Sequence, residues 1–178
     1  MSAKPPPDGS KTVAYSRVTM SHMMQPQDAN PEGIVHGGVV MKHIDDAAGV
    51  VALRHTRCNV VTASIDRLDF HNPAFIGNLL SLKASLNLVG TTSMEVGVRV
   101  ETEDLKTGEI RHTASAYLTF VALDENFRPR SVPPLAMETD EDRRRNRQAR
   151  NRRRVRLAEK THEKSCRNGP DDCSQATE

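Results

Sequence analysis

Apolar residues recur at spacings of three and four along residues 39–55, a stretch that contains neither proline nor a cluster of turn residues. One stripe of a helical wheel collects Val40, Ile44, Ala47, Ala48, Val51 and His55. This spacing is typical of a helix that buries one face. The pattern therefore predicts one amphipathic helix over residues 39–55.

Beyond this helix, apolar and polar residues alternate. Residues 80–88 and 94–100 each follow the alternation, and Gly90-Thr91-Thr92 separates them. This pattern predicts a β-hairpin with one buried face. Residues 13–20, 60–70 and 110–123 are rich in β-branched or alternating apolar residues, so we expect a strand in each. Pro26 and Pro31 mark the polar loop that follows the first strand.

Five predicted strands and one helix indicate an α+β protein. Short connections favour antiparallel pairing of neighbouring strands, and such a sheet commonly buries only one face. We expect the helix to cover that face. The chain has 178 residues, of which 37% are apolar, which suits a single domain.

The composition changes sharply after Pro133-Pro134. Residues 140–160 contain nine arginines, whereas residues 161–178 are mostly polar, with Gly, Pro, Ser and acidic residues. Residues 1–139 carry 13 Lys and Arg against 15 Asp and Glu, and residues 140–178 carry 12 against 8. We expect a flexible segment at 1–11, one domain at 12–136, an Arg-rich helical extension at 137–160 and a disordered tail at 161–178.

Several classes of protein fit the composition poorly. Only 3% of residues are aromatic and Trp is absent, which argues against nucleic-acid folds that stack bases. No apolar run approaches the ~20 residues that cross a bilayer, and we expect a cytoplasmic protein. Metal-ligand spacing is lacking both among the cysteines (Cys58, Cys166, Cys173) and among the histidines (His22, His43, His55, His71, His112). We therefore expect no metal and no cofactor.

Gly37 and Gly38 lie where the loop at 28–38 enters the predicted helix. The first turn of a helix presents unpaired N–H groups and a partial positive charge. Glycine lets a ligand approach these donors closely, so a developing oxyanion can be stabilised there. The alternative explanation is that the glycines only form a tight turn.

Asp45 and Asp46 occupy different positions on the helical wheel. Asp45 lies roughly 110° from the centre of the apolar stripe and Asp46 roughly 150° from it. Asp45 therefore borders the buried face, where partial desolvation strengthens a carboxylate as a general base or nucleophile. Asp46 is expected in solvent. The alternative for Asp45 is an ordinary surface charge.

Three separated motifs follow one another along the chain. They are Asn30-x-x-Gly33-x-Val35-His36-Gly37-Gly38 with Met41 and Ile44-Asp45, then Val61-Thr62-Ala63-Ser64-Ile65-Asp66, then Gly90-Thr91-Thr92-Ser93-Met94-Glu95. In this combination residues 13–134 resemble the hotdog-fold acyl-CoA thioesterases, which include the cytosolic long-chain acyl-CoA hydrolases of animals and small bacterial enzymes.

The resemblance implies a hotdog fold in residues 12–136 and hydrolysis of fatty acyl-CoA to fatty acid and CoA. It implies Asp45 as the catalytic carboxylate and Asn30, from the facing subunit, as the residue that positions water or thioester. Gly37 and Gly38 would receive the thioester oxygen. CoA contacts are implied for Gly90, Thr91, Thr92, Ser93, Thr62 and Ser64. A simple hairpin turn is the alternative for residues 90–93, and packing or substrate contact is expected of His36.

The resemblance also implies a homodimer, with a trimer of dimers as a larger assembly. A different functional class, a regulatory protein that binds CoA or acyl-CoA without turnover, is the alternative, although a pure binder does not need Asn30 and Asp45. For the arginine run at 143–156 three explanations stay open: a solvated helix, contacts to CoA phosphates, or non-specific binding to RNA or DNA.

Overall fold

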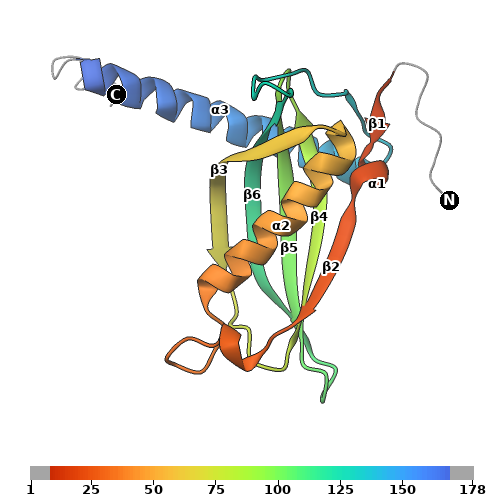
Figure 1. Cartoon of the computed structure of the whole chain (residues 1–178), viewed down its shortest axis with the longest axis vertical. Coiled ribbons are helices and arrows are strands. Elements are labelled where there is room, and N and C mark those ends of the chain that lie inside the picture. The colour runs from red at the N-terminus through yellow and green to blue at the C-terminus, as the bar shows by residue number, and fades with distance from the viewer. Residues whose placement is uncertain (1–8, 169–178) are drawn as a thin grey trace.

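The computed structural model describes residues 9–168 of the chain. A long helix, α2 (Gly37–Thr56), lies across one face of a five-stranded antiparallel sheet (Figure 1). The strand order is β2-β4-β5-β6-β3, with β2 at Val18–Met23, β3 at Asn59–Phe70, β4 at Leu79–Val89, β5 at Ser93–Glu103 and β6 at Ile110–Leu123. This is the α+β hotdog arrangement that we expected.

The predicted apolar stripe of α2 faces the sheet. Its members are each at most 2% exposed, namely Val40, Ile44, Ala47, Ala48, Val51 and His55. The helix begins two residues before the predicted segment and ends one residue after it. Arg57 follows in the left-handed conformation, with φ at 56°, and donates its N–H to the Leu53 carbonyl, which ends the helix.

The inner face of the sheet supplies the other half of the core. The predicted β4–β5 hairpin is confirmed, and its alternation holds except at Leu88, which a register shift after Leu86 places opposite Glu95 on the outer face. Eight apolar side chains of the two strands are at most 3% exposed, namely Leu80, Leu82, Ala84, Leu86, Met94, Val96, Val98 and Val100. Packing between α2 and this face therefore sets the position of every group on the helix.

Part of the outer face of the sheet is also buried, so the expectation of a single buried face is wrong over that part. Helix α3 (Asp140–Asn168) runs over it, and Asn87 and Glu95 there are 3% and 4% exposed. Asn146 donates to the Asn87 carbonyl at 2.7 Å, and Arg152 binds Glu95 at 2.6 Å. Hydrophobic periodicity does not detect this contact because polar groups make it.

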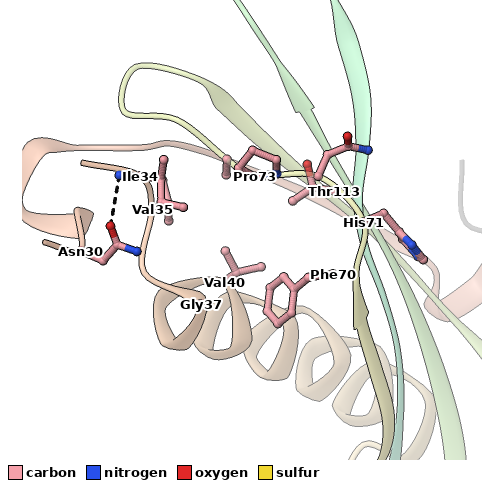
Figure 2. Close-up of a pocket in the computed structure, with 11 residues that line it drawn as sticks. Asn30, Ile34, Val35, Gly37, Val40, Phe70, His71, Pro73 and Thr113 are labelled. Atoms are coloured by element: carbon pink, nitrogen blue, oxygen red, sulfur yellow. Dashed lines mark hydrogen bonds between the residues drawn. The ribbon is translucent and has the colours of Figure 1, made fainter. Parts of the chain in front are cut away.

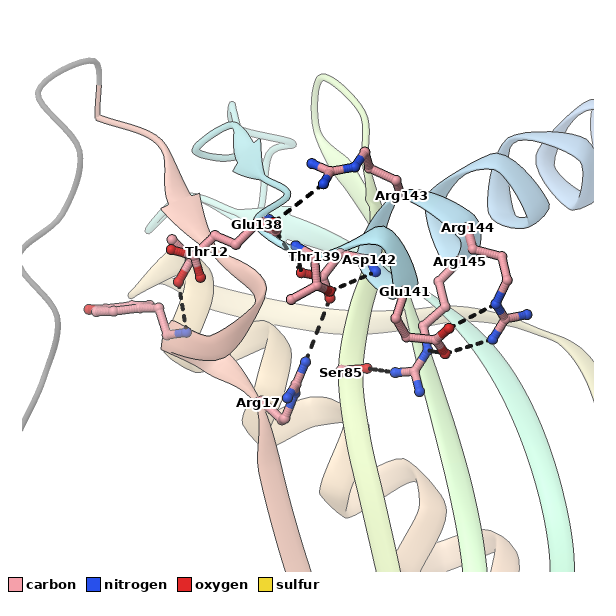
Figure 3. A network of polar contacts seen from close by, with 11 residues as sticks. Thr12, Arg17, Ser85, Glu138, Thr139, Glu141, Asp142, Arg143, Arg144 and Arg145 are labelled. Atoms are coloured by element: carbon pink, nitrogen blue, oxygen red, sulfur yellow. Dashed lines mark hydrogen bonds and ion pairs between the residues drawn. The ribbon is translucent and has the colours of Figure 1, made fainter.

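Polar contacts also fix the beginning of α3 (Figure 3). Asp142 donates its N–H to the Thr139 hydroxyl at 3.1 Å and accepts the Thr139 N–H at 3.1 Å, which forms a capping box. Arg17, just before β2, lies 3.6 Å from Asp142, and Arg145 donates to the Ser85 hydroxyl on β4 at 3.0 Å. The first turns of the Arg-rich extension are thus packed against the domain.

The first predicted strand is wrong over its first half. Residues Val13–Ser16 form the short helix α1, which begins where the Thr12 hydroxyl accepts the Tyr15 N–H at 3.2 Å. Only Val18–Met23 pair as a strand. Four apolar and polar residues are too few to separate a helical turn from a strand.

The expected flexible ends need correction as well. Lys11, expected in the flexible segment, belongs to β1 (Lys11–Thr12), which pairs in parallel with β7 (Leu135–Ala136). Residues 161–168 continue α3 and are not disordered. Residues 1–8 and 169–178, the rest of these expectations, lie outside the described residues. A short 3₁₀ turn, η1 (Pro26–Asp28), completes the elements, and none of the helices in residues 9–168 is long and apolar enough to span a bilayer.

Candidate active site

A cavity of about 310 Å³ lies at the N-terminal end of α2 (Figure 2). It is enclosed by the loop that precedes the helix and by the end of β3 and the residues after it. Its lining includes Asn30, Gly37 and Phe70, together with Ile34, Val35, Val40, His71, Asn72, Pro73, Ala74 and Thr113. Most of this surface is apolar, so the Asn30 amide is one of few polar groups that a ligand would meet there.

Asn30 holds the loop that forms one wall of the cavity. Its side-chain oxygen accepts the N–H groups of Glu32 at 3.0 Å and Ile34 at 3.2 Å. Its side-chain nitrogen has no hydrogen bond to any residue within 9–168, although Asn30 lines the cavity. The side chain therefore shapes the loop with one atom and keeps a donor open with the other.

His36 caps α2 and changes what the two glycines offer. Its Nδ1 accepts the Gly38 N–H at 2.9 Å, so the expectation of two open donors is wrong for Gly38. A Cβ on Gly38 would lie 3.0 Å from that nitrogen, which explains glycine at this position. The Gly37 N–H has no partner within the described chain, and Gly37 lines the cavity. Of the two glycines, only Gly37 therefore offers an open N–H group at the cavity.

Asp45 is half-buried on α2 and is joined to the neighbouring strand. The Thr62 hydroxyl on β3 donates to Asp45 Oδ1 at 2.7 Å. Asp46 is exposed and lies 3.9 Å from Lys42, as expected of the solvated neighbour. Asp45 does not line the cavity that Asn30 and Gly37 share, so one chain does not bring all the predicted site residues together.

The residues implied in CoA contact lie in three places. Thr62 faces α2, whereas Ser64 is on the outer face, where its hydroxyl donates to Asp66 at 2.6 Å. The hairpin turn at 90–93 lies at the opposite end of the sheet from the cavity (Figure 1). Its Gly90 leaves room for Arg153 of α3, since a Cβ there would lie 2.6 Å from that guanidinium.

Sequence reasoning missed the partners of the arginine run. Arg152 binds Glu95 on β5, and Arg156 binds Asp66 on β3, so neither arginine is part of a solvated face. Both acids lie in the motifs quoted above, on strands that otherwise alternate apolar and polar residues. The sequence signal for these ion pairs is a carboxylate within a predicted strand, combined with a run of arginines elsewhere in the chain.

Four of the histidines lie in two ring pairs. The rings of His22 and His43 stack with centroids 4.1 Å apart, and those of His71 and His112 are 4.6 Å apart. Burial lowers the pKa of His43 and of His112. In the part of the chain that the structure describes, no group of three or more His, Cys, Asp or Glu side chains is placed to hold a metal ion.

Comparison with known sequences finds relatives that are named as acyl-CoA thioester hydrolases. The family model of the thioesterase superfamily matches residues 32–109. VdlD of Helicobacter pylori is 40% identical over 129 residues, which cover 72% of this chain and 74% of VdlD. YkhA of Bacillus subtilis, named an uncharacterized acyl-CoA thioester hydrolase, is 42% identical over 127 residues, with 71% and 74% covered. The human cytosolic acyl coenzyme A thioester hydrolase is 36% identical over 136 residues, and this chain spans only 36% of its length.

Solved structures resemble this one throughout the domain. An apo-hexameric acyl-CoA thioesterase is 39% identical, with a TM-score of 0.82 over 84% of this chain and 96% of its own. The acyl-CoA hydrolase of Staphylococcus aureus, in complex with butyryl-CoA, CoA and CoA disulfide, is 33% identical, with a TM-score of 0.82 over 89% of this chain and 97% of its own. Three further structures of the latter enzyme each replace one residue, an Asn, an Asp or a Thr, by Ala. Sequence and fold agree, and the chain therefore belongs to the thioesterase superfamily of hotdog proteins.

Proposed function

We propose that the chain hydrolyses fatty acyl-CoA to a free fatty acid and CoA, with Asp45 as the catalytic carboxylate. The observation that carries the proposal is the hydrogen bond by which Thr62 holds Asp45 at the border of the core. In the S. aureus hydrolase, the substituted Asn and Asp are 15 positions apart and the Asp and Thr 17, and the same intervals separate Asn30, Asp45 and Thr62. This agreement supports the same three residues here.

In the proposed reaction a water molecule attacks the thioester carbonyl carbon. Asp45 takes a proton from that water as a general base, while the hydrogen bond from the Thr62 hydroxyl holds the Asp45 carboxylate in place. The carbon–sulfur bond breaks, the sulfur takes up a proton, and CoA leaves as the thiol. Direct attack by Asp45 on the carbonyl carbon is the alternative route. Water is the second substrate in this scheme, so no cofactor takes part.

The Gly37 N–H is the proposed donor to the thioester oxygen. It lies at the positive end of α2, lines the cavity and has no partner within residues 9–168. A donor held rigidly by a helix stabilises the negative charge that develops on that oxygen. The cap that His36 provides supports this assignment, because it occupies the Gly38 N–H and fixes the first turn.

A homodimer completes the proposed site. Strand β3 is at the edge of the sheet, and its residues Val61 and Ile65 are 45% and 41% exposed. A second copy that adds its own β3 would continue the sheet and cover this edge. Asn30 of the facing subunit would then supply its free amide nitrogen to the site of Asp45. A trimer of dimers is the proposed larger assembly, in keeping with the hexameric relative.

For CoA we assign contacts to the turn formed by Gly90, Thr91, Thr92 and Ser93. A turn of small residues offers N–H groups and hydroxyls to an anion. Thr62 and Ser64 are assigned to holding the carboxylates of Asp45 and Asp66 instead. A cytoplasmic location also stays a prediction.

The test is a thiol-release assay of the full chain with acyl-CoAs of increasing chain length. We expect turnover, with a chain-length preference set by the apolar lining of the cavity. A regulatory binder would bind acyl-CoA, measured by calorimetry, without releasing thiol. Tight binding without release at any chain length would contradict the proposed activity and favour that alternative.

A further inference from the structure

Strand β3 is irregular at two positions near the candidate site. Along its pairing with β6, Thr62 lies opposite Phe120 and Ser64 opposite Thr119, so Ala63 between them has no partner. Asp66 is skipped in the same way, between Ile65 and Arg67. Each skipped residue is a β-bulge, and each bulge changes which face the following side chains point to.

The bulges decide that Thr62 faces Asp45. Thr62, Ile65 and Leu68 are three positions apart, yet they lie opposite Phe120, Leu118 and Ala116, which all point into the core. In a regular strand, residues three apart point to opposite faces. A loss of the bulge at Asp66 would therefore shift the preceding part of β3 by one residue and turn the Thr62 hydroxyl away from α2.

A set of polar contacts holds the bulge at Asp66. The side chain of Asp66 is only 8% exposed although the strand is at the edge of the sheet. It accepts the hydroxyl of Ser64 at 2.6 Å and that of Thr119 at 3.1 Å, and Arg156 of α3 binds it as an ion pair. Arg156 also contacts the Thr119 hydroxyl. A buried carboxylate needs such a partner, because an unpaired charge there is costly.

The other anchors of α3 do not reach β3. Asn146 binds the backbone of Asn87 on β4, and Arg152 binds Glu95 on β5. Arg152 and Arg156 are thus two similar contacts, one helical turn apart, between the same helix and the same sheet. They differ in the strand that they bind. A comparison of the two arginines can therefore distinguish docking of α3 on the sheet from positioning of β3.

We propose that Arg156 is a positioning residue for hydrolysis: by binding Asp66 it fixes the bulge in β3 that aims Thr62 at Asp45. The proposal rests on the proposed function, because it takes Asp45 as the catalytic carboxylate. It gives the Arg-rich extension a task in the reaction without contact to substrate. It also assigns a purpose to Asp66 at the end of the second sequence motif.

The kinetic test compares Arg156→Met with the matched control Arg152→Met. We expect Arg156→Met to lower kcat by up to about tenfold, the loss expected when the Thr62 hydroxyl itself is removed, because a small displacement of a reacting group slows the reaction. KM should stay within about twofold in both variants, and Arg152→Met should keep near-wild-type kcat. Arg156→Lys, which restores the charge, should recover most of the loss. Equal losses in the two Met variants would mean that α3 acts only by docking, and would overturn the proposal.

A double-mutant cycle asks whether Arg156 acts through Thr62. In the Thr62→Val background the hydroxyl is already absent, so adding Arg156→Met should change kcat by less than about twofold. If the two losses multiply instead, Arg156 acts elsewhere and the proposed route is wrong.

Hydrogen exchange provides a readout that needs no activity. Peptides that cover residues 59–70 should exchange faster in Arg156→Met than in the wild type or in Arg152→Met, because the bulge is released. Unchanged exchange in Arg156→Met would overturn the proposal even if the enzyme is active. If the wild-type chain releases no thiol at all, the proposed function fails, whereas the exchange result still decides whether Arg156 holds β3.

Discussion

The hydroxyl of Thr62 lies 2.7 Å from Oδ1 of Asp45, and this contact joins the central helix to the edge strand of the sheet. The donor comes from a strand and the acceptor from a helix that runs across the opposite side of the core. Their distance therefore depends on the packing of α2 and on the register of β3. A local motif in the sequence cannot report either quantity.

The proposed role of Asp45 predicts a large kinetic effect. Asp45→Asn keeps the shape of the side chain but removes its charge, and kcat should fall about 100- to 10,000-fold, the range lost with a general base. Asp46→Asn is the matched control, because Asp46 is the adjacent and exposed carboxylate. Thiol release measures both, and size-exclusion chromatography checks the assembly. Near-wild-type turnover of Asp45→Asn would remove Asp45 from the mechanism.

Thr62 should matter through its hydroxyl and not through its volume. Thr62→Val is nearly isosteric and leaves Asp45 Oδ1 without this donor, so we expect kcat to fall on the order of tenfold. Thr62→Ser should stay close to the wild type, since it keeps the hydroxyl. If Val and Ser behave alike in the thiol-release assay, the hydrogen bond does not position Asp45.

Sharing of the site between subunits can be tested by complementation. Asn30→Ala and Asp45→Ala should each be inactive alone. When both are unfolded and refolded together, half of the dimers are mixed and each has one intact site, so about a quarter of wild-type activity should return. Mixing without refolding is the control. Absence of recovery, with mixed dimers verified by mass spectrometry, would place Asn30 and Asp45 in the same subunit's site.

Buried His55 predicts a loss of stability in acid. Its Nε2 lies 2.9 Å from the Pro133 carbonyl, and burial lowers the pKa of His55 from 6.5. The unfolded chain then takes up the proton at a higher pH than the folded chain, so stability is complete above about 6.5 and declines as pH falls below it. Thermal unfolding measured from pH 8 to pH 5, roughly 1.5 pH units on either side of 6.5, should show this decline as a fall in Tm.

The control for this pH effect is His55→Gln, which can still donate to the carbonyl but does not titrate. Its Tm should depend less steeply on pH than that of the wild type. Some slope should remain, because burial also lowers the pKa of His43 and His112. An identical slope in the variant and the wild type would assign the acid sensitivity to other groups.

The sequence predicts the helix and most of the sheet because apolar spacing reports burial directly. The stripe from Val40 to His55 and the hairpin of residues 80–100 are confirmed for this reason. The same criterion fails for α3, whose contacts with the outer face run through Asn146 and Arg152. It also fails at Val13–Ser16, where four residues do not define a period.

For the candidate site, the wheel separates Asp45 from Asp46 because both lie on one regular helix. It gives no information on partners from other elements. His36 accepts the Gly38 N–H and Thr62 donates to Asp45. Both contacts depend on side-chain directions that follow from the helix cap and from the bulges in β3. Spacing along the chain locates functional groups, whereas contacts across the sheet decide what each one does.

The order of the strands has a consequence for folding during synthesis. β3 is synthesised before β6, its neighbour in the sheet. Asn59 can therefore pair with Leu123, and Phe70 with Ala114, only after β6 has been synthesised. Pairings of such sequence separation form slowly, since a long loop must close before any contact stabilises it. On the ribosome β3 therefore stays unpaired until nearly the whole domain has emerged, and the contact from Thr62 to Asp45 is among the last to form.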